Sequence, residues 1–365
     1  MRPGCRSVIS CGGCAVTAES VFLQHFPATQ SRSDLTIPSP VISVVMPLYN
    51  AAPYVADAVE SVLQQQFHDF ELVIVNDGST DQSARIVSAI QDPRIRLIHQ
   101  QNQGQSAAVN RGVRESAGQF IKIVDADDWI NPEHLSAQMQ SLEGTTDCVS
   151  ACRWGYFRED FRRPAVRAEH ADRDYADPLQ WLVDSLTRDE GMMGGWKWLI
   201  PRTVWDRSGG YDPRLSLNND FHASIAVLLA SQGVRFAAEA VYSYRKGQAG
   251  SLSGSGTRRA YTSALLTTQL GCELLLARED SARIRHLCAV RYQRWAYDFF
   301  PACPDLADAA ESHSQKLGGA IVSFPGGRLG RLLAALLGWR NARRLQQVAC
   351  LSGWNYVRRI KRKLS

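Results

Sequence analysis

Short apolar runs alternate with amphipathic segments between residues 41 and 124. Four runs have the length and composition of buried strands: Val41–Met46, Glu71–Val75, Ile95–Ile98 and Phe120–Val124. Between them, apolar residues recur three or four positions apart, which predicts helices. Four repeats of strand and helix predict an α/β fold, with parallel strands joined by right-handed crossovers.

Polar residues follow three of the predicted strands at the point where each ends. Tyr49 follows the first strand, Asp77 the second, and the acidic segment with Asp125 and Asp127 the fourth. In sheets of this kind, ligands bind beyond the carboxyl ends of the strands. We therefore expect these residues to meet in one crevice, although they are far apart in sequence.

Asp125 and Asp127 are candidate metal ligands. If the strand continues through them, their side chains point to the same side, because side-chain direction repeats every two residues. Two carboxylates suit a hard cation such as Mg²⁺ or Mn²⁺. The alternative is an ordinary solvated acidic turn, and the expected crevice favours the metal site over it.

The first strand-to-helix turn argues against a nicotinamide-binding Rossmann domain. Such a domain needs a glycine-rich turn so that the backbone can approach a pyrophosphate. Here the turn contains Pro47 and Pro53, and no glycine lies between Val41 and Phe70. A nucleotidyltransferase, which also pairs carboxylates with Mg²⁺, usually has a glycine-rich basic loop at this place and is disfavoured for the same reason.

Four motifs taken together resemble those of the family 2 glycosyltransferases of GT-A fold. They are Val44–Asn50, Val75–Asp81, Asn102–Gly104 and Asp125–Asp128, and the resemblance covers about residues 41–250. It implies a Rossmann-like, mostly parallel sheet flanked by helices. It also implies an inverting transferase that moves a sugar, usually from a UDP-sugar, to an acceptor hydroxyl with the help of a divalent metal ion.

The resemblance also implies roles for single residues. Asp77 matches the acid that hydrogen-bonds the nucleotide base, Asp127 the direct metal ligand, and Asp125 an acid that reaches the ribose or a metal-bound water. Arg245 lies where the family contacts the diphosphate, but neither Gly247 nor Gln248 supplies the histidine of the family pattern. The donor-binding candidates are Pro47, Tyr49, Asn50, Asp77, Gly104, Asp125, Ala126 and Arg245.

Asp220 is the candidate general base. It matches the second acid of the family's Glu-Asp pair, whose first position is Asn219 here. Asp212 is the alternative base, and Asp220 could also serve as the cap of the helix that begins beside it. Because Asn219 departs from the pair, a non-catalytic relative that only binds nucleotide sugars stays an alternative.

Acceptor contacts are expected from two tryptophans and one acid. Trp196 and Trp198 lie among glycines and could form a stacking wall for a sugar, although one of them could equally belong to the core. Asp128 is expected to orient the loop or the sugar. Gln293–Trp295 resembles a fragment of the signature of processive synthases, but with the wrong spacing, so we expect transfer of one sugar.

The charge of the chain is concentrated in its tail. The net charge is +5, yet the segment after Glu311 holds eleven Lys and Arg and no acid, which argues against a nucleic-acid binder. Leucines at helical spacing between arginines predict a basic amphipathic helix, which would either lie on anionic lipid or dock on the protein. No segment of about eighteen uncharged apolar residues is present to span a bilayer.

The sequence thus predicts four parts. Residues 1–38 form a poorly structured extension, 39–254 the GT-A domain, 255–325 a helical lobe and 326–365 a basic amphipathic tail. Nine scattered cysteines indicate reduced thiols in a cytoplasmic protein. We expect any contact with the cytoplasmic face of a membrane to be peripheral and to be made by the tail. The expected acceptor is a glycan, a lipid-linked sugar or a protein.

Overall fold

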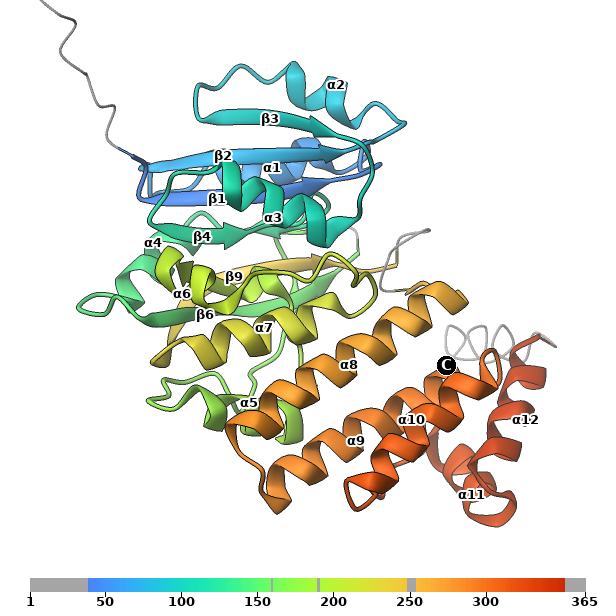
Figure 1. The fold of residues 1–365 in the computed structure, drawn as a ribbon. Coiled ribbons are helices and arrows are strands. Elements are labelled where there is room, and N and C mark those ends of the chain that lie inside the picture. Colours follow the sequence, from blue (N-terminus) through green and yellow to red (C-terminus); the bar gives the residue numbers. More distant parts are fainter. Residues whose placement is uncertain (1–38, 159, 189–190, 248–253, 352–365) are drawn as a thin grey trace, which may run out of the picture. The chain divides into compact units, whose positions relative to one another are not determined.

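The computed structural model describes residues 39–158, 160–188, 191–247 and 254–351 (Figure 1). The predicted N-terminal extension, residues 1–38, lies outside these ranges, as do Gln248 and the last fourteen residues of the predicted tail.

Four parallel strands form the first half of the sheet. β1 (Ile42–Leu48) pairs with β2 (Phe70–Asp77) on one side and with β4 (Phe120–Ile123) on the other, and β2 pairs with β3 (Ile95–Gln100). Every residue of β1 is buried, as expected for a strand whose two faces are covered by helices. The four predicted strands are confirmed, and their carboxyl ends lie at one edge of the sheet.

Three helices connect these strands: α1 (Val55–Leu63), α2 (Ser83–Ser88) and α3 (Gln105–Glu115). Figure 1 shows α1 and α3 against the strands of this half-sheet. The approach of α3 depends on Gly112, because a Cβ atom there would overlap the side chain of Val45 on β1. Close contact brings the N-terminus of α3 to the carboxyl ends of the strands.

The second half of the sheet is mixed. The complete order is β3-β2-β1-β4-β8-β6-β9-β5, with β7 at the side of β6. β8 (Trp198–Pro201) is antiparallel to β4 and to β6 (Cys148–Phe157), whereas β6 is parallel to β9 (Gly233–Arg245). The short strands β5 (Trp129–Ile130) and β7 (Ala165–Val166) pair antiparallel with β9 and β6. The sheet is therefore less parallel than the sequence suggested.

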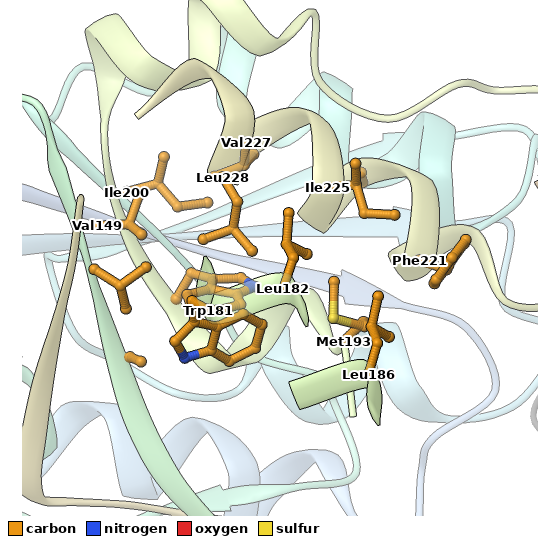
Figure 2. Packing of buried hydrophobic residues seen from close by; sticks show 14 of the residues in the cluster. Val149, Trp181, Leu182, Leu186, Met193, Ile200, Phe221, Ile225, Val227 and Leu228 are labelled. Atoms are coloured by element: carbon orange, nitrogen blue, oxygen red, sulfur yellow. The ribbon is translucent and has the colours of Figure 1, made fainter. Parts of the chain in front are cut away.

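Helices of the second half bury one large apolar cluster. The helices are α5 (Pro178–Arg188), α6 (Arg202–Ser208) and α7 (Asn219–Ala230), whereas α4 (His134–Ser141) packs in a second cluster through Leu135. In Figure 2, Trp181 and Leu182 of α5 pack beside Leu228 of α7. This packing fixes α7, and with it the acidic residue in its first turn.

A helical lobe follows the sheet. α8 (Arg258–Arg278), α9 (Ala282–Phe299) and α10 (Pro304–Lys316) lie side by side, and α11 (Gly327–Leu337) and α12 (Trp339–Leu351) follow them (Figure 1). In the described part of the chain, no helix is long and apolar enough to cross a bilayer.

Candidate active site

A cleft of about 680 Å³ lies at the carboxyl ends of the parallel strands. It collects most of the residues that the sequence singled out, from positions as far apart as 47 and 220. The expected convergence is therefore present. The predicted residues that line the cleft are Pro47, Tyr49, Asn50, Asp77, Gly104, Asp125, Ala126, Asp127, Trp196 and Asp220.

Asn50 ties together two of the loops at this edge. Its backbone φ is +48°, in the left-handed region that asparagine tolerates better than most residues. Its side-chain oxygen accepts hydrogen bonds from the backbone N–H groups of Thr80 (2.8 Å) and Asp81 (3.3 Å). The loop after β1 and the loop after β2 are thus held in one arrangement, while the neighbouring Tyr49 stays 52% exposed in the cleft.

Asp77 holds the loop that precedes α3. One carboxylate oxygen accepts from the backbone N–H of Gln103 and the side-chain amide of Gln100, and the other accepts from the N–H of Gly104, all at 2.7–2.8 Å. Gly104 has a φ of +91°, which favours glycine, and a Cβ there would meet no atom within 4 Å. The wall of the cleft at Gly104 is therefore open backbone.

The acidic segment after β4 forms a turn rather than an extended strand. The strand ends at Ile123, and the N–H of Asp128 donates to the carbonyl of Asp125 (3.2 Å). The argument from side-chain alternation was therefore wrong for Asp125 and Asp127, although both line the cleft. Asp125 also accepts from the side-chain amide of Gln105 (3.0 Å), at the start of α3.

Asp128 faces the protein and positions the turn. Its carboxylate accepts from the Tyr242 hydroxyl (2.9 Å) and from the backbone N–H of Arg245 (2.7 Å). The Tyr242 hydroxyl also accepts from the N–H of Asp125 (3.1 Å). Asp128 is buried and does not line the cleft, so the expected contact with an acceptor sugar is corrected, and the expected role in orienting the loop fits the geometry.

Arg245 braces the same turn. Its Nε donates to the carbonyl of Asp127 (2.7 Å), and its guanidinium lies 4.5 Å from the ring centres of both Tyr54 and Phe157. Arg245 is not among the residues that line the cleft. A direct phosphate contact, expected from the resemblance, is therefore not part of this arrangement, because the guanidinium is packed between two rings.

Burial and mutual repulsion perturb these acids. The pKa of Asp125 is raised well above its usual value, chiefly by burial and further by Asp127 and Asp220. The pKa of Asp128 is raised in the same way, by burial and then by Asp127 and Asp125. Crowded carboxylates with raised pKa values fit a site that receives a cation, because a divalent ion favours their charged forms.

The carboxylates of Asp125 and Asp127 fit a metal ion that is coordinated partly by the protein and partly by the substrate. Among the described residues, no group of three or more His, Cys, Asp and Glu side chains is arranged to hold a metal ion. Mg²⁺, however, is commonly bound through one or two carboxylates together with substrate phosphates and water. Asp125 and Asp127 match that pattern.

Asp220 lies in the first turn of α7 and lines the cleft. Its Oδ1 accepts from the Tyr211 hydroxyl (2.6 Å) and from the backbone N–H of Gly195 (3.1 Å). Burial raises the pKa of Asp220, and the two hydrogen bonds counteract part of that rise. The carboxylate is thus fixed in direction and made more basic than an exposed aspartate, which suits a general base.

The alternative base, Asp212, has different surroundings. It forms a bidentate ion pair with Arg214 (2.6 Å for the shortest contact), which lowers its pKa, and it does not line the cleft. Asn219, which replaces the family's Glu, donates to the Ser106 hydroxyl (3.0 Å). The geometry therefore favours Asp220 over Asp212.

The two tryptophans separate. Trp196 lines the cleft and stacks on Tyr242, with ring centres 4.2 Å apart. Trp198 is fully buried, packs edge to face on Trp181 at 4.9 Å and donates to the Ser224 hydroxyl. The expected acceptor contact of Trp198 is therefore wrong, because the side chain belongs to the core.

Four further residues shape the site and were not assigned from the sequence: Tyr211, Tyr242, Gln105 and Trp295. Tyr211 and Tyr242 lie inside the part of the chain that resembles the family, directly before Asp212 and Ser243. Their positions in the sequence could therefore have marked them as site residues. Gln105 follows Gly104 directly. Trp295 comes from α9, and only the folded chain brings it to the cleft.

The chain is similar in sequence to known glycosyltransferases. Residues 43–200 match glycosyl transferase family 2. The chain is 27% identical to the glycosyltransferase EpsJ of Bacillus subtilis over 213 residues, which are 57% of this chain and 61% of EpsJ. It spans 42% to 61% of the length of the first curated relatives that it matches.

Two solved structures share the fold. TarS of S. aureus (residues 1–349, in complex with UDP-GlcNAc) aligns with a TM-score of 0.55 and 15% identity, over 76% of this chain and 90% of TarS. The mannosyltransferase PcManGT of Pyrobaculum calidifontis, in complex with GDP-Man and Mn²⁺, aligns with a TM-score of 0.50 and 16% identity, over 87% of each chain. At these identities the likeness concerns the fold, and the predicted GT-A type α/β fold with a helical C-terminal part is confirmed.

Proposed function

We propose that the chain, whose residues 43–200 match glycosyl transferase family 2, transfers one sugar from a nucleotide diphosphate sugar to an acceptor hydroxyl with inversion. A UDP-sugar is the proposed donor. The observation that carries the proposal is the cleft itself, in which Tyr49, Asp77, Asp125, Asp127 and Asp220 meet. We propose that this transfer takes part in the biosynthesis of cell-surface polysaccharide or glycolipid.

In this proposal the strand ends β1 and β2 receive the nucleotide. Tyr49 offers an exposed ring to the base, and Asp77 accepts a hydrogen bond from it. Asp77 already accepts three hydrogen bonds, but two carboxylate oxygens have about four acceptor sites, so one further donor can be accommodated.

Asp125 and Asp127 would hold Mg²⁺ or Mn²⁺ together with the diphosphate. Such a cation neutralises the charge that develops on the departing diphosphate. No Lys or Arg lines the described part of the cleft, which supports a metal ion as the partner of the phosphates.

Asp220 removes the proton of the acceptor hydroxyl in this scheme. The acceptor oxygen forms the new bond to the anomeric carbon, the bond from that carbon to the diphosphate oxygen breaks, and the proton moves to the Asp220 carboxylate. Tyr211 and the Gly195 N–H keep the carboxylate aimed at one place while the proton moves.

The test is turnover of UDP-, GDP- and TDP-sugars with Mg²⁺ or Mn²⁺, read by mass spectrometry. Asp220→Asn is expected to lose about 10²-fold or more of turnover, the lower end of what a general base contributes, and to keep donor binding. Asp212→Asn is the matched control, because the same change outside the cleft should leave turnover within a few-fold. Wild-type binding of a nucleotide sugar without turnover would identify a non-catalytic relative instead.

We also propose that α11 attaches the protein peripherally to anionic lipid. Leu329, Leu332 and Leu336 are 56–71% exposed and follow one another at helical spacing, with Arg328 directly before Leu329 and Arg331 directly before Leu332. An exposed apolar stripe flanked by arginines has the character of a helix that lies in a membrane interface.

Other residues of the predicted tail dock on the protein. Arg340 pairs with Asp308 and Glu311, both at 2.6 Å, and Arg343 lies 3.7 Å from Asp298. Leu333 packs near Phe324. The docking alternative therefore holds for these side chains, and contact with lipid is proposed only for the exposed leucines of α11.

Co-sedimentation with vesicles that contain phosphatidylserine tests the attachment. Leu332→Gln with Leu336→Gln should abolish binding, whereas Ile321→Gln, which changes another exposed apolar residue, should not. Equal binding of all three proteins would contradict the proposal.

A further inference from the structure

One part of the cleft lining comes from segments other than the loops that follow the parallel strands. It is formed by Gly191–Gly194, Ser216–Phe221 and Trp295, and we call it the lobe end. Asp220 belongs to it, whereas Tyr49 and Asp77 come from the loops after β1 and β2. Because a general base must touch the acceptor hydroxyl, the inference rests on the proposed function in placing the acceptor at this end.

Trp295 is the contribution of the helical lobe to the cleft. It is the one lining residue from the described chain after residue 247. Its indole stacks on the Phe299 ring at 5.3 Å and 19°, and Phe299 is fully buried and packs near Tyr261. The half-buried indole therefore rests on a fixed aromatic support, so little side-chain entropy is lost when a ligand packs on it.

The lobe end combines apolar surface with a few uncharged polar groups. Met192, Leu217 and Trp295 give the apolar part, and Ser216 and Asn218 give hydroxyl and amide groups. Asn218 has a φ of +64°, and left-handed backbone in a residue other than glycine is often found at functional sites. A sugar ring has matching chemistry, with C–H groups on its faces and hydroxyls around its edge.

The charges of the lining residues indicate which class of acceptor sugar the lobe end can bind. Apart from Asp220, no charged side chain lines the lobe end in the described part of the chain. Arg291 does not line the cleft, because its guanidinium donates to the Gly191 carbonyl (3.5 Å) and lies 4.8 Å from the centre of the Phe221 ring. A carboxylate or phosphate on the acceptor would therefore meet no cation among the described lining residues and would be repelled by Asp220, whereas a neutral ring avoids this repulsion.

We propose that the lobe end binds the acceptor as a neutral sugar ring packed on Trp295. Trp295 is then a specificity-determining residue supplied by the helical lobe. The lobe thereby becomes part of the active site rather than a separate appendage. A glycan or a glycolipid with a neutral terminal sugar is the acceptor class that follows.

Binding and turnover of small glycosides test this assignment separately from the donor chemistry. Binding of methyl glycosides to the wild type is measured by saturation-transfer NMR in the presence of UDP and Mg²⁺, which is diamagnetic and leaves the ligand signals sharp. Matched neutral and uronic acid glycosides are compared, and neutral ones should bind better. Trp295→Ala should weaken glycoside binding by about tenfold, which corresponds to 1.4 kcal/mol. Where transfer occurs, the acceptor KM should rise by the same factor. Trp295→Phe should retain most of the binding.

The affinity for UDP is the control readout, because loss of folding would lower it and loss of the platform would not. Unchanged glycoside binding in Trp295→Ala, with UDP affinity preserved, overturns the assignment. Preference for a uronic acid glycoside, or use of serine and threonine peptides in place of any sugar, overturns it as well. Glycoside binding that depends on Trp295 in a protein without transferase activity would sustain the assignment and refute the proposed function.

Discussion

The hydrogen bond from Tyr211 to Asp220 offers a sharp test of how the carboxylate is tuned. Tyr211→Phe removes one hydroxyl and keeps the ring that packs in the core. Asp220 works as a carboxylate in the proposed mechanism, so activity falls as the pH drops through its pKa. Burial raises this pKa, and the Tyr211 hydroxyl lowers it by stabilising the charged form.

Loss of the hydroxyl must therefore move the acidic limb of the pH–rate profile to higher pH. A hydrogen bond to a charged group contributes about 1.5–3 kcal/mol. Because about 1.4 kcal/mol corresponds to one pH unit, the acidic limb should move upward by about one to two units. Above the new limb, turnover should recover to within about tenfold of the wild type, since the base itself is intact.

The assay is kcat/KM for the best donor of the panel, measured from pH 5 to pH 9. Tyr297→Phe is the matched control, because it removes a hydroxyl that donates to the Val322 carbonyl (3.2 Å) in the helical lobe. Its profile should coincide with that of the wild type. A Tyr211→Phe profile with an unmoved acidic limb would refute the assignment of Asp220 as the titrating base.

Two further changes probe the support of the site. Gly195→Ala places a Cβ where the Tyr211 hydroxyl lies, so turnover should fall at least tenfold while donor affinity, measured by calorimetry, is retained; full activity would contradict this. Burial lowers the pKa of Lys122 to about 8. Between pH 8 and about 10.5 the Lys122 proton is bound in the unfolded state and lost from the folded state. The free energy of unfolding, measured in urea, should therefore rise by about 3 kcal/mol over this pH range. Lys122→Met should lack this rise.

The first half of the fold could be predicted because its signals are local. The strands from Ile42 to Ile123 are apolar runs, and the connecting helices show their own periodicity. The second half depends on contacts between distant segments, such as the antiparallel pairing of β8 with β4 and the parallel pairing of β6 with β9. Periodicity carries no information on which strand becomes a neighbour, so the mixed half-sheet stayed hidden.

The candidate site followed the same division. Residues at strand ends, such as Tyr49 and Asp77, could be placed together because topology brings the carboxyl ends of parallel strands to one edge. Trp198 could not be separated from Trp196, since both lie in one short glycine-flanked segment. Only packing against Trp181 assigns Trp198 to the core. Trp295 was noticed only as part of a motif fragment with the wrong spacing, and its place in the cleft could not be predicted because it depends on how the helical lobe docks.

Hydrogen bonds divide the acids of the site into two kinds. Asp77 and Asp128 accept mainly from backbone N–H groups and from side chains of their own surroundings, so they set the shape of the loops. Asp125 and Asp220 face the cleft with raised pKa values, which means that their charged forms are destabilised in the fold. The pKa of Asp128 is raised as well, so its charge also costs stability, but its hydrogen bonds to Tyr242 and Arg245 hold the turn in place. Asp125 and Asp220 face the cleft, and their charges cost stability until a ligand arrives. Asp220→Asn should therefore be more resistant to thermal unfolding than the wild type at neutral pH, whereas Asp128→Asn should be less resistant, because it weakens the contacts of the turn with Tyr242 and Arg245. Differential scanning calorimetry without ligand decides the point, and a lower melting temperature for Asp220→Asn than for the wild type would show that its carboxylate is structural.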